Sequence, residues 1–133
     1  MDAKEYLSQA YSLDRLAYMT LMKAEEMRRS LYGRNSIQNF GAAEKVIDYE
    51  KKADETINRL IDTRIKIEKA ISAVPDGVQR EILERRYLMY QPFEGGYDKK
   101  SGEYIRGIAE DMNYSERQIY RLHLTALKYI DID

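Results

Sequence analysis

The sequence predicts an all-α protein, in which an N-terminal antiparallel helical hairpin of the coiled-coil type is followed by a helix-turn-helix. Three observations predict this class. Apolar residues recur at spacings of three and four over most of the chain, and 133 residues contain only two prolines. Residues that favour helices dominate the composition. We expect the hairpin over residues 1–74, as a dimerisation or partner arm, and the helix-turn-helix over residues 75–133.

The first helix has the apolar seam of a coiled coil, with spacings that alternate between four and three. Small residues alternate along this seam, so a partner helix could approach closely. The segment 32–41 contains two glycines and several polar residues, which predicts a loop. The seam positions are Tyr6, Ala10, Leu13, Ala17, Thr20, Ala24, Met27 and Leu31.

A second periodic run predicts a second long helix, which ends before Pro75 because proline lacks the backbone donor. Three isoleucines, Ile47, Ile61 and Ile65, lie off its main stripe. We expect a second chain or the C-terminal helices to bury them, although the hairpin could also simply pack on itself. The main stripe consists of Val46, Tyr49, Ala53, Ile57, Leu60, Arg64, Ile67, Ile71 and Val74.

A third, shorter helix follows, and Gln91 and Pro92 end it. Its apolar stripe contains Val78, Ile82, Leu83, Arg86 and Tyr87.

The glycine-rich and charged segment 93–102 predicts an exposed loop. The next short helix is expected to contain Gly107 in its interior, at a cost of about 1 kcal/mol relative to alanine. Its expected buried face consists of Ile105, Ile108, Ala109 and Met112.

A turn and a well-capped final helix follow. Asn113 tolerates the left-handed backbone conformation that ends one helix and redirects the chain. Ser115 is the expected N-cap of the next helix, and Gln118 three residues later completes a capping box. The expected inward face consists of Ile119, Leu122, Ala126 and Ile130.

The outward residues at the start of the final helix indicate DNA binding. Arginine and glutamine can form paired hydrogen bonds with base edges in the major groove, and the backbone donors of a helix start attract phosphate. Residues 112–130 contain one acidic and three basic side chains, which gives this segment a net charge of +2, whereas the net charge of the chain is −1. Any DNA contact must therefore come from a local patch. The predicted DNA-binding residues are Ser115, Glu116, Arg117, Gln118, Tyr120, Arg121 and Lys128, with Tyr120 the best aromatic candidate for a groove contact.

The sequence argues against several other classes of protein. Without cysteine there is neither a disulfide nor a thiolate metal site. His123 has no acidic or histidine partner at metal-ligand spacing, so we expect it to have a packing role. No catalytic residues, metal site or cofactor site emerge, and we expect the protein not to be an enzyme. The charged start has no signal-peptide core and no stretch could span a bilayer, which predicts a cytoplasmic protein that does not contact a membrane.

Residues 74–87, VPDGVQREILERRY, resemble the helix that precedes the helix-turn-helix in region 4 of bacterial sigma factors. There a Leu-Pro turn is followed by an arginine, an aliphatic pair and Leu-Arg-Tyr. The similarity extends through Leu127, although Arg117 lies where sigma factors commonly have a glutamate that contacts a base. The whole chain, which opens on AKEYL at residues 3–7, is similar to small phage and prophage proteins related to the ArpU and RinA late-gene regulators.

The resemblance implies a sequence-specific, phage- or prophage-encoded transcription regulator that acts on late genes. Its expected partners are double-stranded DNA, RNA polymerase and a second copy of the chain, bound through the helical hairpin. The alternative is a coiled-coil interaction protein that docks on RNA polymerase or another partner without contacting DNA bases. Exposure of Arg117, Gln118, Tyr120 and Arg121 separates the two hypotheses, since a pure helical bundle would not need these side chains uncovered.

Overall fold

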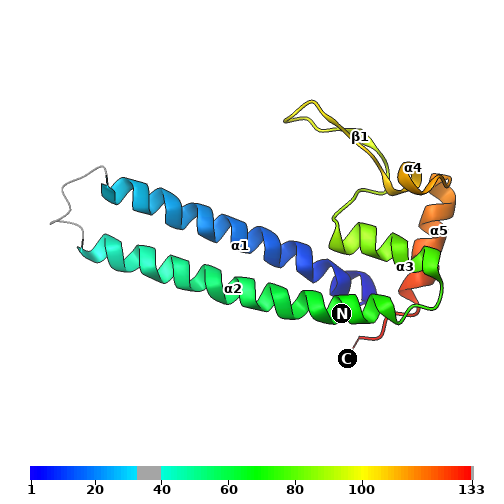
Figure 1. The fold of residues 1–133 in the computed structure, drawn as a ribbon, viewed down its shortest axis with the longest axis horizontal. Coiled ribbons are helices and arrows are strands. Elements are labelled where there is room, and N and C mark those ends of the chain that lie inside the picture. Colours follow the sequence, from blue (N-terminus) through cyan, green and yellow to red (C-terminus); the bar gives the residue numbers. More distant parts are fainter. Residues whose placement is uncertain (33–39, 133) are drawn as a thin grey trace. The chain divides into compact units, whose positions relative to one another are not determined.

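A computed structural model describes residues 1–32 and 40–132, and the described chain is predominantly helical (Figure 1). This confirms the predicted all-α class at the level of helix content. The chain divides into two compact units: unit 1 comprises Met1–Tyr11 and Arg64–Asp133, and unit 2 comprises Ser12–Thr63. Within the described residues, no helix is long and apolar enough to cross a membrane.

Two long helices, α1 (Ala3–Tyr32) and α2 (Phe40–Ser72), contribute to both units. In unit 2 they pack through a narrow seam of small side chains, with Ala17, Ala24 and Ala53 buried. An ion pair also joins the two helices in this unit, between Arg28 of α1 and Glu50 of α2. The predicted loop 32–41 lies outside the described residues except at its ends, as does the side chain of Leu31.

The predicted stripes continue in unit 1, where the fully buried side chains include leucine and isoleucine. The described positions of both predicted stripes are buried or half-buried along their length. Within unit 1, Arg64 at a seam position donates a hydrogen bond from Nη2 to the carbonyl oxygen of Leu88, 3.3 Å away. The fully buried positions of the two predicted stripes in this unit are Ala10, Ile67, Ile71 and Val74, and Leu7, which the prediction did not include, is fully buried as well.

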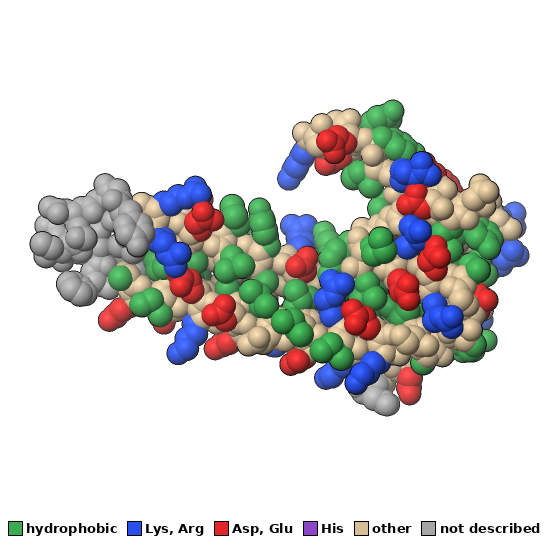
Figure 2. Space-filling view, in the orientation of Figure 1, with side chains coloured by type: hydrophobic (Ala, Val, Ile, Leu, Met, Phe, Trp, Pro, Cys, Tyr) green, Lys and Arg blue, Asp and Glu red, His purple; other side chains and the backbone are tan. Residues whose placement is uncertain are grey.

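The three isoleucines off the stripe of α2 are exposed. Ile47 is 62% exposed, Ile61 50% and Ile65 46%. Ile65 lies in unit 1 together with the C-terminal helices, which therefore do not bury it, so that half of the expectation is wrong for Ile65. Figure 2 shows hydrophobic side chains between charged ones along the visible face of both long helices.

The third helix, α3 (Gly77–Leu83), begins where the sequence predicts, because the side chain of Asp76 accepts a hydrogen bond from the backbone nitrogen of Gln79 at 3.0 Å. A π-helical turn, η2 (Glu84–Leu88), continues it. The chain then leaves the helix through Tyr90, which has a φ of 57°.

A short antiparallel pair of strands, β1 (Gly96–Tyr97) and β2 (Tyr104–Ile105), lies in this region. Strand β1 falls within the segment 93–102 that was predicted as an exposed loop, and β2 falls where the next helix was predicted to begin. Gly96 pairs with Ile105 and Tyr97 with Tyr104, and all four residues are exposed. Ile105 was predicted on the buried face of a helix. That prediction is wrong, because Ile105 lies on a strand and is 45% exposed.

Gly107 is the N-cap of α4 (Ile108–Met112) rather than an interior residue, so the predicted helix-interior cost does not apply. A Cβ atom here would lie 2.5 Å from the backbone nitrogen of Gly95 and 2.6 Å from the carbonyl oxygen of Phe93. This close approach requires glycine. The last helix, α5, spans Glu116–Leu127.

A compact core joins α3, α4 and α5. Ile82, Ile108, Ala109 and Ile119 form its buried centre, and the half-buried residues around it are Val78, Phe93, Met112 and Leu122. The predicted inward residues of α4 and α5, apart from Ile105, are confirmed by their burial.

Candidate nucleic-acid interface

The turn between α4 and α5 has the backbone conformation that the sequence indicates. Asn113 has φ 58° and ψ 45°, the left-handed conformation that ends α4. Ser115 is the N-cap of α5: its Oγ accepts a hydrogen bond from the backbone nitrogen of Gln118 at 3.2 Å. In return, Gln118 Oε1 accepts from the backbone nitrogen of Ser115 at 3.1 Å. These two reciprocal hydrogen bonds form a capping box that fixes the start of α5.

The inner face of α5 fixes the rotation of the helix about its axis. Ile119 and Ala126 are fully buried, and Leu122 packs against the core from a half-buried position. Since successive residues of a helix are about 100° apart, the side chains half a turn away from these must face outward.

One stripe on the outer face carries only basic and apolar side chains. Arg117, Arg121, Leu124 and Lys128 follow one another at spacings of four, three and four, so they lie within an arc of about 60°. All four are exposed, Leu124 by 62%. Among the described residues, none of the three cations has a carboxylate within ion-pair distance. We call these four residues the cationic stripe.

The other predicted site residues flank the stripe. Glu116 and Gln118 are exposed at the start of α5, on either side of Arg117. The Tyr120 side chain contacts the segment before the strands: its hydroxyl donates to Glu94 Oε1 at 3.1 Å, and its ring lies 5.0 Å from that of Phe93. The hydrogen bond to Glu94 raises the pKa of Tyr120. Tyr120 remains 41% exposed beside the stripe.

His123 lies on the inner side of α5, as its predicted packing role requires. It is 5% exposed, and its Nε2 lies 2.7 Å from the hydroxyl oxygen of Tyr87. Phe93 meets its ring edge-on at a centroid distance of 4.8 Å. Burial, with smaller effects of Lys4 and Arg86, lowers the pKa of His123 to about 4, and burial raises the pKa of Tyr87 to about 12. Both groups are therefore neutral near pH 7.

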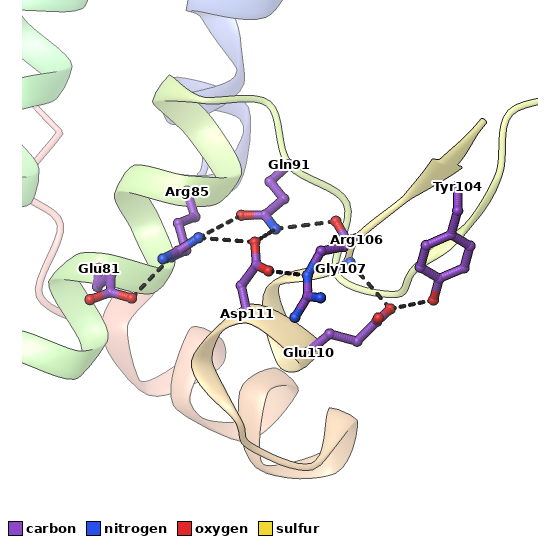
Figure 3. A network of polar contacts seen from close by, with 8 residues as sticks. All are labelled: Glu81, Arg85, Gln91, Tyr104, Arg106, Gly107, Glu110 and Asp111. Atoms are coloured by element: carbon purple, nitrogen blue, oxygen red, sulfur yellow. Dashed lines mark hydrogen bonds and ion pairs between the residues drawn. The ribbon is translucent and has the colours of Figure 1, made fainter. Parts of the chain in front are cut away.

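A polar network centred on Asp111 joins α4 to the preceding elements (Figure 3). Asp111 Oδ2 accepts from Gln91 Nε2 at 2.6 Å and pairs with Arg85 at 3.3 Å, while its Oδ1 accepts from Arg106 Nε at 2.5 Å. The hydrogen bonds from Arg106 and Gln91 lower the pKa of Asp111. Arg85 is also paired with Glu81 of α3. The carboxylate of Asp111 in α4 thus binds side chains from η2, from the segment after η2 and from the end of the strands.

A second contact anchors the strands to α4. The hydroxyl of Tyr104 donates to Glu110 Oε1 at 2.6 Å, and the backbone nitrogen of Gly107 lies 3.4 Å from the same oxygen (Figure 3). At the far end, Lys99 and Lys100 are exposed in a turn that the carboxylate of Asp98 closes. Sequence reasoning identified neither this anchor nor the Asp111 network, because both join side chains from separate elements.

Within the described part of the chain, no three histidine, aspartate or glutamate side chains lie together in a way that could hold a metal ion. Comparisons of this chain with protein-family models, with curated proteins and with solved structures find no match.

Proposed function

We propose that the protein is a sequence-specific DNA-binding transcription regulator, in which α4 and α5 form a helix-turn-helix and α5 enters the major groove. The observation that carries this proposal is the cationic stripe. Three basic side chains, which form no ion pair with any residue that the structure describes, lie on the outer face and at the C-terminal cap of α5. They lie opposite a buried face that fixes the orientation of the helix. A chain of net charge −1 needs such a local patch to attract a polyanion.

The members of the stripe suit different contacts. Arg117 lies at the second position of α5, close enough to the capped end to bond a guanine edge in the groove. Arg121 follows one turn later. Lys128 lies about 16 Å further along the helix axis than Arg117, and we assign it to a phosphate. Leu124, between the cations, can contact a thymine methyl group.

The wider role is also part of this proposal. The similarity of residues 74–127 to sigma region 4, and of the whole chain to phage late-gene regulators, supports a phage- or prophage-encoded regulator that contacts RNA polymerase. The exposed isoleucines of α2 and the narrow alanine seam of unit 2 support a homo-oligomer formed through the long helices.

Two substitutions on the stripe test the proposal, because they should have different signatures. A duplex recovered by selection from random-sequence DNA and a scrambled duplex serve as probes for the full chain, in fluorescence anisotropy over a salt series. Arg117→Ala should weaken binding to the selected duplex by roughly 5- to 150-fold and barely alter binding to the scrambled one. Lys128→Ala should weaken both similarly and reduce the slope of log affinity against log salt by about 1.

Lys66→Ala is the matched control. Lys66 is exposed on the part of α2 that belongs to unit 1, and its replacement also removes one positive charge. This variant should bind both duplexes as the parent does. If the parent selects no sequence, or if both stripe variants bind as the parent does while folded, the proposal fails and the interaction-protein hypothesis replaces it.

A further inference from the structure

Unit 1 contains a cavity of about 280 Å³ that the proposed DNA contacts do not use. Helix α1 contributes two side chains to its wall, η2 contributes two, and one follows η2. This volume lies near the lower end of the range for small-molecule sites, which suits a ligand with a single ring. The lining residues are Ser8, Tyr11, Arg86, Tyr87 and Tyr90.

The backbone is irregular where it lines this cavity. Arg86 and Tyr87 belong to the π-helical turn η2, and Tyr90 has a φ of 57°, a conformation that costs free energy for a residue other than glycine. Irregularities of both kinds are concentrated at binding sites.

The charged residue among those that line the cavity is Arg86, which is half-buried. Its guanidinium donates one hydrogen bond to the carbonyl oxygen of Gln91 at 3.2 Å and lies 4.7 Å from the ring centroid of Phe93. In the part of the chain that the structure describes, no carboxylate forms an ion pair with it, and the cavity lining contains no acidic residue. A partly desolvated guanidinium without a carboxylate favours binding of an anion, most strongly of a carboxylate or phosphate that it can bond in pairs.

The rest of the lining is mainly aromatic. The rings of Tyr11 and Tyr90 meet edge-on at a centroid distance of 5.3 Å, and the buried ring of Tyr87 forms a further side. Aromatic faces and edges favour a planar ring over an aliphatic one of similar size.

We propose that this cavity binds a small aromatic carboxylate, with the carboxylate on Arg86 and the ring among the three tyrosines. The site is independent of the proposed DNA-binding function. It nevertheless touches α5 through Tyr87, whose hydroxyl bonds His123 on the inner face of that helix. A bound ligand would therefore lie one hydrogen bond away from the helix that carries the cationic stripe.

Benzoate is the probe, and His123 is a built-in reporter because it is the one histidine in the sequence. Titration of the full chain with sodium benzoate, at ionic strength held constant with chloride, should shift the imidazole NMR signals along a saturable curve. A ligand of this size should have a dissociation constant on the order of 1 to 10 mM. Cyclohexanecarboxylate and inorganic phosphate, used as separate probes, should bind at least about fivefold more weakly.

Two variants and a control complete the test. Arg86→Met should weaken benzoate binding at least about tenfold, whereas Arg117→Met, which removes the same charge from the exposed face of α5, should leave it unchanged. Tyr11→Leu removes one ring from a residue that is 47% exposed, and should weaken benzoate binding several-fold without changing that of phosphate. This second variant keeps the test decisive if Arg86→Met does not fold.

Failure to observe a saturable shift with benzoate would overturn the proposal. Equal binding of phosphate or of the cyclohexane acid would overturn the aromatic class of ligand. Retention of full benzoate affinity in folded Arg86→Met or in Tyr11→Leu would show that the ligand binds elsewhere. None of these results bears on DNA binding, which the stripe variants test separately.

Discussion

His123 and Tyr87 form a buried polar pair inside unit 1, on the side of α5 that faces away from the cationic stripe. Their bond satisfies two polar groups that would otherwise be costly to bury, and Phe93 packs against the imidazole ring. Burial disfavours protonation of the imidazole, and the positive charges of Lys4 and Arg86 add to this effect. The pair therefore stabilises the fold only while His123 is neutral.

This pairing predicts a loss of stability on mild acidification. The pKa of His123 is about 4 in the folded chain and 6.5 for an ordinary histidine, so below pH 6.5 the unfolded chain takes up a proton that the folded chain does not. The contribution of neutral His123 to the free energy of unfolding is complete above pH 6.5 and declines as the pH falls toward 4. Relative to a His123→Phe variant, the free energy of unfolding should fall by about 2 kcal/mol between pH 7 and pH 5.

Urea denaturation of both proteins at several pH values measures this difference. The variant also leaves the Tyr87 hydroxyl without its partner, so the free energies of unfolding of the two proteins should already differ at pH 7. The prediction is tested only by how this difference changes with pH. Parallel pH profiles would contradict it.

The sequence predicted which residues of α5 are buried and which are exposed in most cases. Ile119, Ala126 and the cations Arg117 and Arg121 lie on the expected faces, because a single capped helix with strict periodicity leaves no other arrangement. The contact of Tyr120 with Glu94 could not be predicted, since it joins residues 26 positions apart through a segment that has no periodicity.

At the scale of elements, Gly107 decides where the last helix pair begins. Its backbone packs directly against the segment that enters the strands, and its φ of −86° is open to any residue, so only the missing side chain matters. The position is thus a close contact between two chain segments rather than a flexible joint.

Gly107→Ala should therefore lower the free energy of unfolding by about 1–3 kcal/mol, through the overlap of the new Cβ with the backbone of Phe93, Glu94 and Gly95. Gly96→Ala is the matched control, because a Cβ at Gly96 meets nothing within 4 Å. Chemical denaturation followed by circular dichroism compares the two. Similar stability of the two variants would refute the close packing at Gly107.

The sequence could predict the long helices and the start of α3 after Pro75. It could not predict the π-helical turn that ends at Leu88, before the expected end at Gln91 and Pro92, or the strands β1 and β2. Each strand has two residues, too few for alternation to appear. Ile105 fits the helical spacing of Ile108, Ala109 and Met112 by chance, and that fit placed the start of α4 too early. The anchor of Tyr104 on Glu110 and the close approach at Gly107 override this local pattern.

The exposed isoleucines of α2 predict that the protein forms a dimer. We expect light scattering at tens of micromolar to give twice the chain mass of 15.7 kDa. Replacement of both Ile47 and Ile61 by glutamine should shift the protein to the monomer, because it removes apolar surface that a second copy would bury. Lys45→Gln with Arg59→Gln, which introduces the same residues at other exposed positions of α2, should not. A monomeric parent would refute the homo-oligomer.

An NMR titration of the isotope-labelled full chain with the selected duplex shows which surface of the protein binds DNA. We predict that the largest changes in backbone amide signals fall on the turn 113–115 and on the cationic stripe, Arg117, Arg121, Leu124 and Lys128, with small changes over residues 12–32 and 40–63. Changes confined to those two ranges, or an unchanged spectrum at saturating duplex, would contradict the claim that the outer face of α5 binds DNA.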